Sequence, residues 1–252
     1  MHKNFLNYIR RYDEYYTKYE HVEDIFDRYI PYDKLKDKII YCPCDSDKSN
    51  FVIYLKEHKD DLQYKELIYT SDDYNTHLDL FEYCDVIITN PPFSKLVKEF
   101  IPILNKVNKK FFILGSLVSL CSYFENFEDK TIKYVRSDKY FDFIIPEDCN
   151  LPNCPMYIYI SNLNINSYYK EPLFDKKQTN EVIAYINGIE YKEYDKISNI
   201  PKNEYNTIVV PSTVILEHNK KYFNIISVAT RHNVTYSDNK KRYRRLIVKR
   251  KL

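Results

Sequence analysis

The first half of the sequence alternates between short apolar runs and segments with helical periodicity, and this alternation limits the possible folds more than any other feature. Apolar runs of strand length occur at residues 37–42, 65–70, 85–89 and 110–114. Between them, apolar residues recur at every third or fourth position, which predicts a helix from about residue 49 and another over residues 94–107. This order predicts an α/β fold of right-handed βαβ units with a mainly parallel sheet, in which ligands bind at the carboxyl ends of the strands.

Two prolines mark where predicted helices end or bend. Val22, Ile25 and Tyr29 share one helical face, and Pro31 follows them, so this helix is predicted to end before the proline. Pro102 lies inside the helix predicted over residues 94–107. Because proline has no N–H for the helical ladder, we expect a kink at this point.

The second half of the sequence changes toward β-strand patterns. Asn187 and Gly188 lie between alternating residues of the segment 183–191, which is the strongest short-range signal for a β-hairpin. Further strand-like runs occur at residues 139–145, 156–160, 207–210 and 222–228. We therefore predict two parts, an α/β core over residues 1–165 and a β-rich C-terminal region over residues 166–252.

The composition is that of a globular protein with one sizeable core. Of the 252 residues, 44% are hydrophobic, but no apolar stretch approaches the roughly 18 to 20 residues of a membrane span. The N-terminal residues lack the apolar centre of a signal peptide. We expect no membrane association and an intracellular, cytoplasmic location, or a viral protein that acts inside its host cell. The six cysteines form no CxxC pair, so neither a metal site nor a disulfide framework is expected.

Positive charge is concentrated at the C-terminus. Residues 231–252 hold nine Lys or Arg and one acid, whereas the whole chain has a net charge of +2. A basic end on an otherwise acidic body is typical of a surface that binds nucleic acid. The apolar run inside residues 243–249, flanked by charges, fits a solvated edge strand equally well. The predicted nucleic-acid contacts are Arg231, Lys240, Lys241, Arg242, Arg244 and Arg245.

The tetrapeptide Asn90-Pro91-Pro92-Phe93 directly follows the apolar run that ends at Thr89. An amino group on a planar ring is a poor nucleophile because its lone pair is delocalised. An Asn oxygen and a neighbouring carbonyl can localise that pair by accepting both N–H bonds. The prolines fix the backbone and aim the carbonyl of Pro91 outward, while Phe93 offers a flat face to a base. The tetrapeptide therefore indicates methyl transfer to a planar amino nitrogen, with the alternative that Pro-Pro only ends a strand and Phe93 is a core residue.

Three separated stretches together resemble the EcoRI-type adenine-specific DNA methyltransferases. They are Asp13 to Thr17, Tyr41 to Ser46 with Ser49 to Phe51, and Asp85 to Ser94. The C-terminal part is similar to the closing segments of that family at Val210, Pro211, Thr213, Asn219, Phe223, Ile225, Ile226 and Tyr243 to Lys251. The tetrapeptide also occurs in methyltransferases for glutamine side chains and for RNA bases. The combination of stretches, and not the tetrapeptide alone, therefore selects this family.

The resemblance implies a Rossmann-like class I sheet that binds S-adenosylmethionine, followed by a β-rich lobe that reads the target. Asn90 and the carbonyl of Pro91 would accept the two hydrogens of the target amino group. Pro92 would hold the turn, and Phe93 would stack on the extruded base. The cofactor-binding residues that the resemblance implies are Tyr16, Thr17, Asp45, Ser46, Ser71, Asp72 and Asp73.

The implied cofactor site departs from the wider superfamily at one point. The loop at Asp45 and Ser46 contains no Gly, whereas most methyltransferases of this type use Gly there to let the backbone approach the cofactor. Small polar side chains would have to replace it. Of the acids Asp72 and Asp73, one would take the ribose hydroxyls and the other would reach the adenine amino group of the cofactor, and the assignment stays open.

The sequence therefore predicts a site-specific DNA N6-adenine methyltransferase, of the kind found in restriction–modification systems, that acts on double-stranded DNA. An RNA adenine or protein glutamine methyltransferase of the same fold stays an alternative. A non-catalytic nucleic-acid-binding relative is a further alternative, which the Gly-free loop would favour. The recognition sequence, a partner endonuclease and the oligomeric state stay open, and a monomer is compatible with the sequence.

Overall fold

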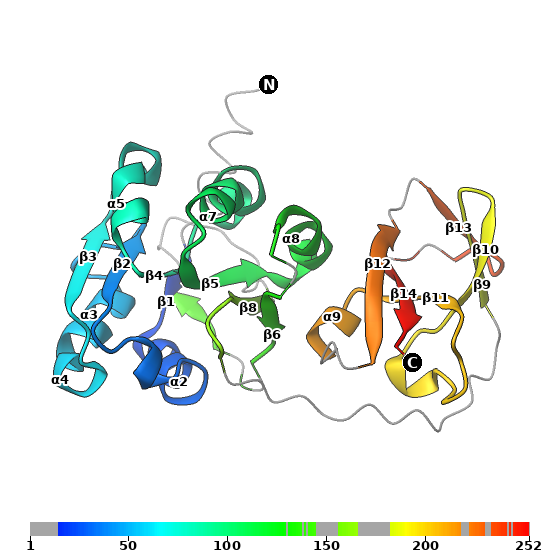
Figure 1. The fold of residues 1–252 in the computed structure, drawn as a ribbon, viewed down its shortest axis with the longest axis horizontal. Helices are drawn as coiled ribbons and strands as arrows, with labels where there is room; N and C mark the ends of the chain where they lie inside the picture. Colours follow the sequence, from blue (N-terminus) through cyan, green and yellow to red (C-terminus); the bar gives the residue numbers. More distant parts are fainter. Residues whose placement is uncertain are drawn as a thin grey trace. The chain divides into compact units, whose positions relative to one another are not determined.

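The structure, a computed structural model, covers the greater part of the chain in two units. It describes residues 15–129, 131–137, 139, 141–144, 156–165, 182–217, 222–229, 233–240, 242 and 244–251. The first unit is Met1–Ser119 with Asn126–Ser167, and the second is Leu120–Glu125 with Tyr168–Leu252. Figure 1 draws the first unit from blue to green and most of the second from yellow to red. The separate roles predicted for residues 1–165 and 166–252 stay a prediction.

A six-stranded sheet with the order β3-β2-β4-β5-β8-β6 forms the centre of the first unit. Its strands are β2 (Ile39–Pro43), β3 (Glu66–Thr70), β4 (Val86–Thr89), β5 (Lys110–Ser116), β6 (Lys133–Val135) and β8 (Tyr157–Ser161). The strands β3, β2, β4 and β5 are parallel, which confirms the predicted βαβ pattern, and β8 and β6 complete the sheet in antiparallel pairing. The sequence pattern did not predict β6, because three residues are too few to show a period.

Helices cover both faces of this sheet (Figure 1). On one face lie α2 (Tyr19–Arg28), α3 (Asn50–Glu57) and α4 (Lys59–Leu62), and on the other lie α5 (Leu78–Tyr83) and α7 (Ile101–Val107). The end of α2 before Pro31 confirms the prediction for this helix. Alternate strand residues, such as Ile40 and Ile88, join the same buried core as the apolar face of α2 and α3. The sheet is thus buried on both faces, as expected for parallel strands.

The helix predicted over residues 94–107 is interrupted. The chain forms α6 (Phe93–Lys95), then a π-helix at Leu96–Phe100, and then α7, whose second residue is Pro102. Proline donates no backbone hydrogen bond, and its ring clashes with the carbonyl four residues earlier. The helix type thus changes just before Pro102, with wider turns before the proline, and the kink expected at Pro102 stays a prediction.

A small antiparallel sheet joins two segments that are far apart in the sequence. β1 (Tyr16–Thr17) pairs with β7 (Phe143–Ile144). Of the strand predicted over residues 139–145, the described residues form only β7, and β7 pairs outside the main sheet. This pairing fixes the segment that precedes α2.

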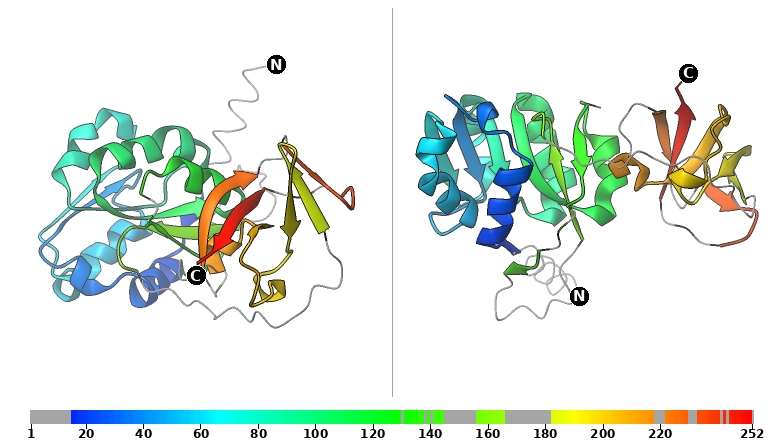
Figure 2. Two further views of the ribbon diagram at one scale, coloured as in Figure 1. Left: turned by 45° about the vertical axis from the view of Figure 1, so that its right-hand side comes forward. Right: turned by 90° about the horizontal axis from the view of Figure 1, so that it is seen from below.

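The second unit contains a six-stranded sheet with the order β12-β14-β11-β10-β9-β13 (Figure 2). Its strands are β9 (Val182–Ile186), β10 (Ile189–Glu193), β11 (Thr207–Pro211), β12 (Phe223–Ala229), β13 (Val234–Tyr236) and β14 (Arg245–Arg250). The hairpin of β9 and β10 confirms the prediction, since Asn187 and Gly188 have φ angles of 51° and 80°. Positive φ at both central residues is the requirement of a type I′ turn, which matches the twist of the strands.

The position of β14 corrects one interpretation of the basic end. The interpretation of this segment as an edge strand is wrong, because β14 lies between β12 and β11 and pairs with both. Its three central residues, Leu246, Ile247 and Val248, are buried. An interior strand buries successive apolar residues on both faces, so the apolar run inside the charged segment has a structural use.

Two helices and one strand of this part of the chain were not predicted. They are α8 (Leu120–Asn126), α9 (Val214–Glu217) and β13. Segments of three to seven residues hold too few positions to distinguish a helical from a strand period. No helix in the described part of the chain is long and apolar enough to cross a membrane.

Candidate active site

Three neighbouring parallel strands end at the same edge of the first sheet, and predicted site residues follow each of them. The ends of β2, β3 and β4 are followed by Asp45, by Asp72 and by Asn90 respectively. A cavity of about 650 Å³ lies at this edge. The predicted residues that line it are Tyr16, Thr17, Asp45, Ser46, Ser71, Asp72, Asp73, Asn90 and Pro92. All residues predicted to bind the cofactor thus meet the Asn of the tetrapeptide around one cavity, whose volume is typical of small-molecule sites.

The loop after β2 has a glycine-like backbone without a glycine. Cys44 has a φ of 69°, in the left-handed region that costs a residue with a Cβ roughly 1 to 2 kcal/mol. The backbone N–H of Asp45 donates to the carbonyl of Thr70 at 3.0 Å, which ties the loop to the end of β3. The sequence predicts that small polar side chains replace Gly in this loop. The structure adds that Cys44 takes the backbone conformation that Gly usually provides.

The carboxyl group of Asp45 is buried and held by hydroxyl groups. Ser49 donates to one oxygen, and the Oγ1 of Thr89 lies 2.8 Å from the other. The Thr89 hydroxyl also contacts the carbonyl of Pro43, so its one hydrogen faces two acceptors when Asp45 is ionised. Burial raises the pKa of Asp45 to about 6, against the opposing effect of the hydrogen bonds from Ser49 and Thr89. No ion pair to Asp45 is found among the described residues.

The two acids after β3 have different partners. His77 Nε2 lies 2.8 and 2.9 Å from the oxygens of Asp72, and this hydrogen bonding lowers the pKa of Asp72. Asp73 accepts from the backbone and side-chain nitrogens of Asn75 at 3.1 and 2.9 Å, and these bonds lower the pKa of Asp73. Both acids are exposed at the cavity. In the described ranges, no group of three or more His, Cys, Asp or Glu side chains is arranged to hold a metal ion.

The Asn90 side chain is oriented by the segment before α2. Its Nδ2 donates to the carbonyl of Tyr15 at 2.7 Å and lies 3.3 Å from Thr17 Oγ1. Asn50, the first residue of α3, donates its own Nδ2 to the carbonyl of Thr17 at 2.8 Å. Asn90 Oδ1 has no hydrogen-bond partner in the part of the chain that the structure describes. The acceptor end of the amide is therefore available at the cavity.

The other residues of the tetrapeptide differ in exposure. Pro91 is buried, whereas Pro92 and Phe93 are half-buried, and of these three only Pro92 lines the cavity. The ring of Phe93 is stacked on Tyr15, with centroids 6.2 Å apart and planes at 24°. Phe93 also packs against the core. It thus lies at the margin of the core with part of its ring exposed.

Several residues without a predicted role line the same cavity. They are Tyr15, Cys44, Lys48, Ser49, Asn50, Phe51, Tyr74, Lys95 and Ile144. Lys95 pairs with Glu99 at 3.7 Å, and its Nζ lies 5.9 Å from the ring centre of Tyr74. Asn50 lies within one of the stretches that carry the resemblance and Lys95 directly follows another, so their positions in the sequence could have indicated them. Ile144 carries no such signal, because only its pairing with Tyr16 brings it to the cavity.

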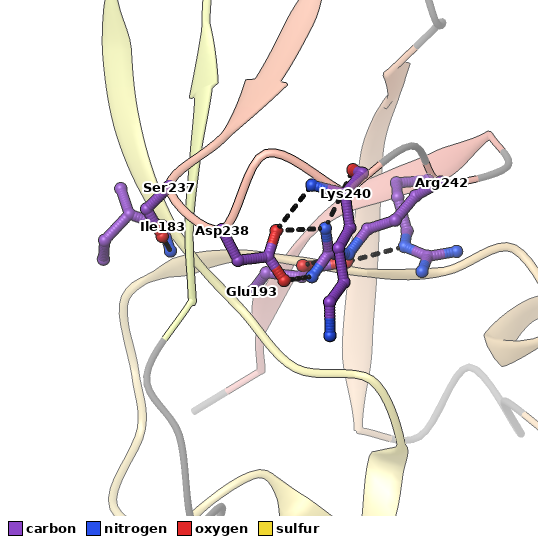
Figure 3. Close-up of polar contacts among 7 residues, drawn as sticks. Ile183, Glu193, Ser237, Asp238, Lys240 and Arg242 are labelled. Carbon is purple, nitrogen blue, oxygen red and sulfur yellow. Dashed lines mark hydrogen bonds and ion pairs between the residues drawn. The ribbon is translucent and has the colours of Figure 1, made fainter.

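In the second unit, two of the predicted nucleic-acid contacts bind a buried carboxylate (Figure 3). Glu193 ends β10, and its side chain is 2% exposed. The Nε atoms of Arg242 and Arg245 lie 2.8 Å from its two oxygens. Arg242 also forms two hydrogen bonds of 2.7 Å with Asp238, and its guanidinium lies 4.3 Å from the ring centre of Tyr236. The charges of these two arginines are therefore balanced within the unit.

The turn that carries Lys240 is held by hydrogen bonds that backbone N–H groups donate. Ile183 and Ser237 exchange hydrogen bonds of 2.9 and 3.0 Å, and Asp238 accepts from the backbone N–H of Lys240 at 3.1 Å. The side chain of Lys240 is exposed, and no partner for it is found within the described residues.

The remaining predicted basic contacts either pair with residues of the second unit or lie outside the described residues. Arg244 donates to Ser122 Oγ at 2.6 Å and lies 3.7 Å from a carboxylate oxygen of Glu125. Arg231 and Lys241 lie outside the described residues. Of the six predicted contacts, Lys240 is thus the described one whose side chain forms no ion pair or hydrogen bond among the described residues, although its charge helps to lower the pKa of Asp238.

Similarity to known proteins extends over both units. A family described as "Adenine-specific methyltransferase EcoRI" matches residues 8–82 and 71–251. Type II methyltransferase M.EcoRI of Escherichia coli is 26% identical over 287 aligned positions, which cover 85% of this chain and 85% of that protein. Type II methyltransferase M.MgeORF184P of Mycoplasma genitalium is 26% identical over 273 positions, which cover 85% of this chain and 82% of that protein. The resemblance predicted from the sequence is confirmed.

Proposed function

The chain belongs to the adenine-specific methyltransferase EcoRI family, and from that premise we propose that it is a site-specific DNA N6-adenine methyltransferase. It transfers a methyl group from S-adenosylmethionine to the exocyclic amino group of an adenine flipped out of double-stranded DNA. One observation carries the proposal: a single cavity is lined by Asn90 and by every residue predicted to bind the cofactor. A methyl donor and an amino acceptor have to meet within such a space.

We propose that the first unit is a Rossmann-like class I core. The charged and polar side chains that line its cavity fit S-adenosylmethionine. Asp45 is a buried carboxyl group whose partners are hydroxyls, which suits it to a ligand cation. Asp72 and Asp73 offer oxygens to ribose hydroxyls and to the adenine amino group, and Lys48 offers a cation to a carboxylate. When bound, the cofactor supplies an electrophilic methyl group on a sulfonium centre.

Asn90 and Pro91 prepare the acceptor nitrogen. Asn90 Oδ1 and the carbonyl of Pro91 each accept one hydrogen of the amino group, which concentrates the lone pair on nitrogen. The positive charge that develops there lies beside two oriented oxygen dipoles. Direct transfer needs no thiolate nucleophile. Burial raises the pKa of Cys44, the cysteine that lines the cavity, which keeps its thiol protonated.

Phe93 and the second unit hold the nucleic acid. Flipping a base costs on the order of a few kcal/mol, and stacking on an aromatic side chain returns about 1 to 3 kcal/mol. The partly exposed ring of Phe93 supplies that surface. Lys240, which is exposed and forms no ion pair in the described part of its unit, contacts phosphate, whereas Arg242 and Arg245 shape the turn on which it lies. Phosphate contacts position the duplex, and side chains of the β-rich unit read the bases.

The test is methyl transfer from labelled S-adenosylmethionine to random-sequence duplex DNA, to RNA and to a protein lysate. We expect label in N6-methyladenine of duplex DNA. Asn90→Ala should lower kcat by about 10²- to 10³-fold, as loss of one oriented catalytic dipole does elsewhere. The matched control is Asn164→Ala, which removes an exposed asparagine of the same unit.

Each outcome of this experiment has a defined meaning. Label confined to RNA or to glutamine would replace the proposed substrate with one of the alternatives. Absence of transfer together with no calorimetric binding of S-adenosylmethionine would favour a non-catalytic nucleic-acid-binding protein. Full activity of the Asn90→Ala variant would remove the proposed role of that residue. Sequencing of the methylated library would identify the recognition sequence.

A further inference from the structure

The orientation of the Asn90 amide is set by a hydrogen-bond acceptor beside its nitrogen. Its neighbour at 2.7 Å is the carbonyl oxygen of Tyr15, which can only accept a hydrogen bond. A reversed amide would place two oxygens against each other. The nitrogen therefore has to face Tyr15, and Oδ1 is the atom left for the cavity.

The second amide hydrogen of Asn90 has an acceptor in the same segment. Thr17 Oγ1 lies 3.3 Å from Nδ2, and Thr17 is buried with 6% of its surface exposed. Both hydrogens of the amide thus point toward residues 15–17. A side chain held at two donors is restricted to one rotamer and one amide orientation.

The segment that supplies these acceptors is itself held from two directions. β1 pairs with β7, with Thr17 opposite Phe143. From the other direction, Asn50 donates to the carbonyl of Thr17 at 2.8 Å. Asn50 begins α3, a helix whose apolar residues are part of the core, so the anchor of this contact is rigid.

We propose that Thr17 and Asn50 are positioning residues for Asn90. Asn50 holds the Tyr15–Thr17 segment in place, and this segment binds the amide nitrogen so that Oδ1 is presented to the target amino group. This inference rests on the proposed function and assigns to Thr17 a part beyond contact with the cofactor. It predicts that both residues act on the rate of transfer through Asn90, and that Asn50 acts on this rate more than on binding of either substrate.

Two nearly isosteric substitutions test the inference. Asn50→Asp keeps the shape but replaces the donor with an acceptor, and Thr17→Val keeps the shape but removes the hydroxyl oxygen. We expect each to lower kcat about tenfold while KM for DNA changes less than about threefold. KM for S-adenosylmethionine should change less than about threefold in Asn50→Asp, whereas in Thr17→Val it also reports the predicted contact of Thr17 with the cofactor. Thr17→Ser retains the oxygen and should keep kcat within about twofold of the parent protein. Far-UV circular dichroism and thermal unfolding check that all variants fold.

A double-variant cycle separates this inference from a general structural effect. When Asn90 is already Ala, Asn50→Asp should have no further effect on the residual rate, since interacting residues are not additive. A full tenfold loss in that background, or a raised KM for S-adenosylmethionine with unchanged kcat, would overturn the inference. An active parent protein whose Asn50→Asp and Thr17→Val variants keep their kcat would overturn it without affecting the proposed function.

Nuclear magnetic resonance gives a readout that does not depend on activity. In ¹⁵N-labelled protein, the side-chain amide signal missing from Asn90→Ala belongs to Asn90. We expect its two hydrogens to exchange slowly in the parent protein and in Thr17→Ser, and rapidly in Asn50→Asp and Thr17→Val. Equal exchange in all four proteins would overturn the inference even if the parent protein methylates no substrate.

Discussion

Asp45 in the first unit and Glu193 in the second are both buried carboxyl groups, but different partners balance them. Asp45 contacts two hydroxyl groups, and burial raises its pKa to about 6. Glu193 lies 2.8 Å from the Nε atoms of both Arg242 and Arg245. The first group can become neutral by taking up a proton, whereas the second has two permanent cations beside it.

This difference separates a structural acid from one that is available to a ligand. A buried carboxylate with its own arginines has its charge balanced within the folded chain. Asp45 has no such cation in the described part, so ionising it costs free energy until a positive ligand arrives. A buried acid with a raised pKa at a cavity is typical of a functional site. The contrast supports the proposal that Asp45, and not Glu193, would meet the cation of a bound cofactor.

Removing the charge of Glu193 is expected to have the largest effect on stability. Glu193→Gln leaves Arg242 and Arg245 without their buried carboxylate, and we expect the free energy of unfolding to fall by about 3 to 5 kcal/mol. Urea denaturation at pH 7 measures this change. Glu190→Gln, at an exposed position of the same strand, is the matched control. If both variants unfold alike, Glu193 does not stabilise the second unit through its arginines.

His21 provides the next test, because it is a buried group of the first unit that stays neutral. Its ring is stacked on Phe141 at 4.7 Å, and burial lowers its pKa from 6.5 to about 4. The free energy of unfolding is therefore not reduced by His21 above pH 6.5. It should fall by about 3 kcal/mol as the pH falls toward 4, because the unfolded chain takes up the proton first. Unfolding of the parent protein and of His21→Phe at pH 7 and pH 4 measures this loss. An unchanged acid-induced loss in the variant would contradict the prediction.

Asp45 should change stability in the opposite direction over an overlapping range. Its folded pKa of about 6 exceeds the value of 3.8 for a free Asp, so the cost of ionisation is absent below pH 3.8 and complete above pH 6. Stability should therefore fall by about 3 kcal/mol as the pH rises through this range. Asp45→Asn should not show this fall, and Asp47→Asn, at an exposed position of the same loop, should retain it. Identical pH profiles for the two variants would show that Asp45 ionises freely.

The smallest expected effect concerns the backbone that carries Asp45. At Cys44, where φ is 69°, Ala keeps the unfavourable Cβ and Gly removes it. Cys44→Gly should therefore be more stable than Cys44→Ala by about 1 kcal/mol. Cys121 lies in α8, where Gly is about 1 kcal/mol less favourable than Ala, so the same pair there should give the opposite sign. Thermal unfolding of the four variants checks this, and the same sign at both positions would argue against strain at Cys44.

Much of the candidate site could be predicted because strand ends are local features. The apolar runs that became β2, β3 and β4 predict where each strand ends, and parallel strands bring those ends to one edge. The sequence therefore placed Asp45, Asp72 and Asn90 together. It did not show that Cys44 takes a left-handed conformation, because that depends on the loop's hydrogen bond to the neighbouring strand. The roles of these residues in binding and catalysis stay predictions.

By itself, the sequence determined the kinds of the longer elements and the position of one tight turn. The hairpin at Asn187 and Gly188 and the position of the tetrapeptide after β4 depend on neighbours within a few residues. Only the tertiary structure decided the partners of the chemically important groups. Asn90 meets the carbonyl of Tyr15 across 75 positions of the chain, and Arg245 meets Glu193 across 52. Such pairs are set by the order of strands and the packing between them, which no local period encodes.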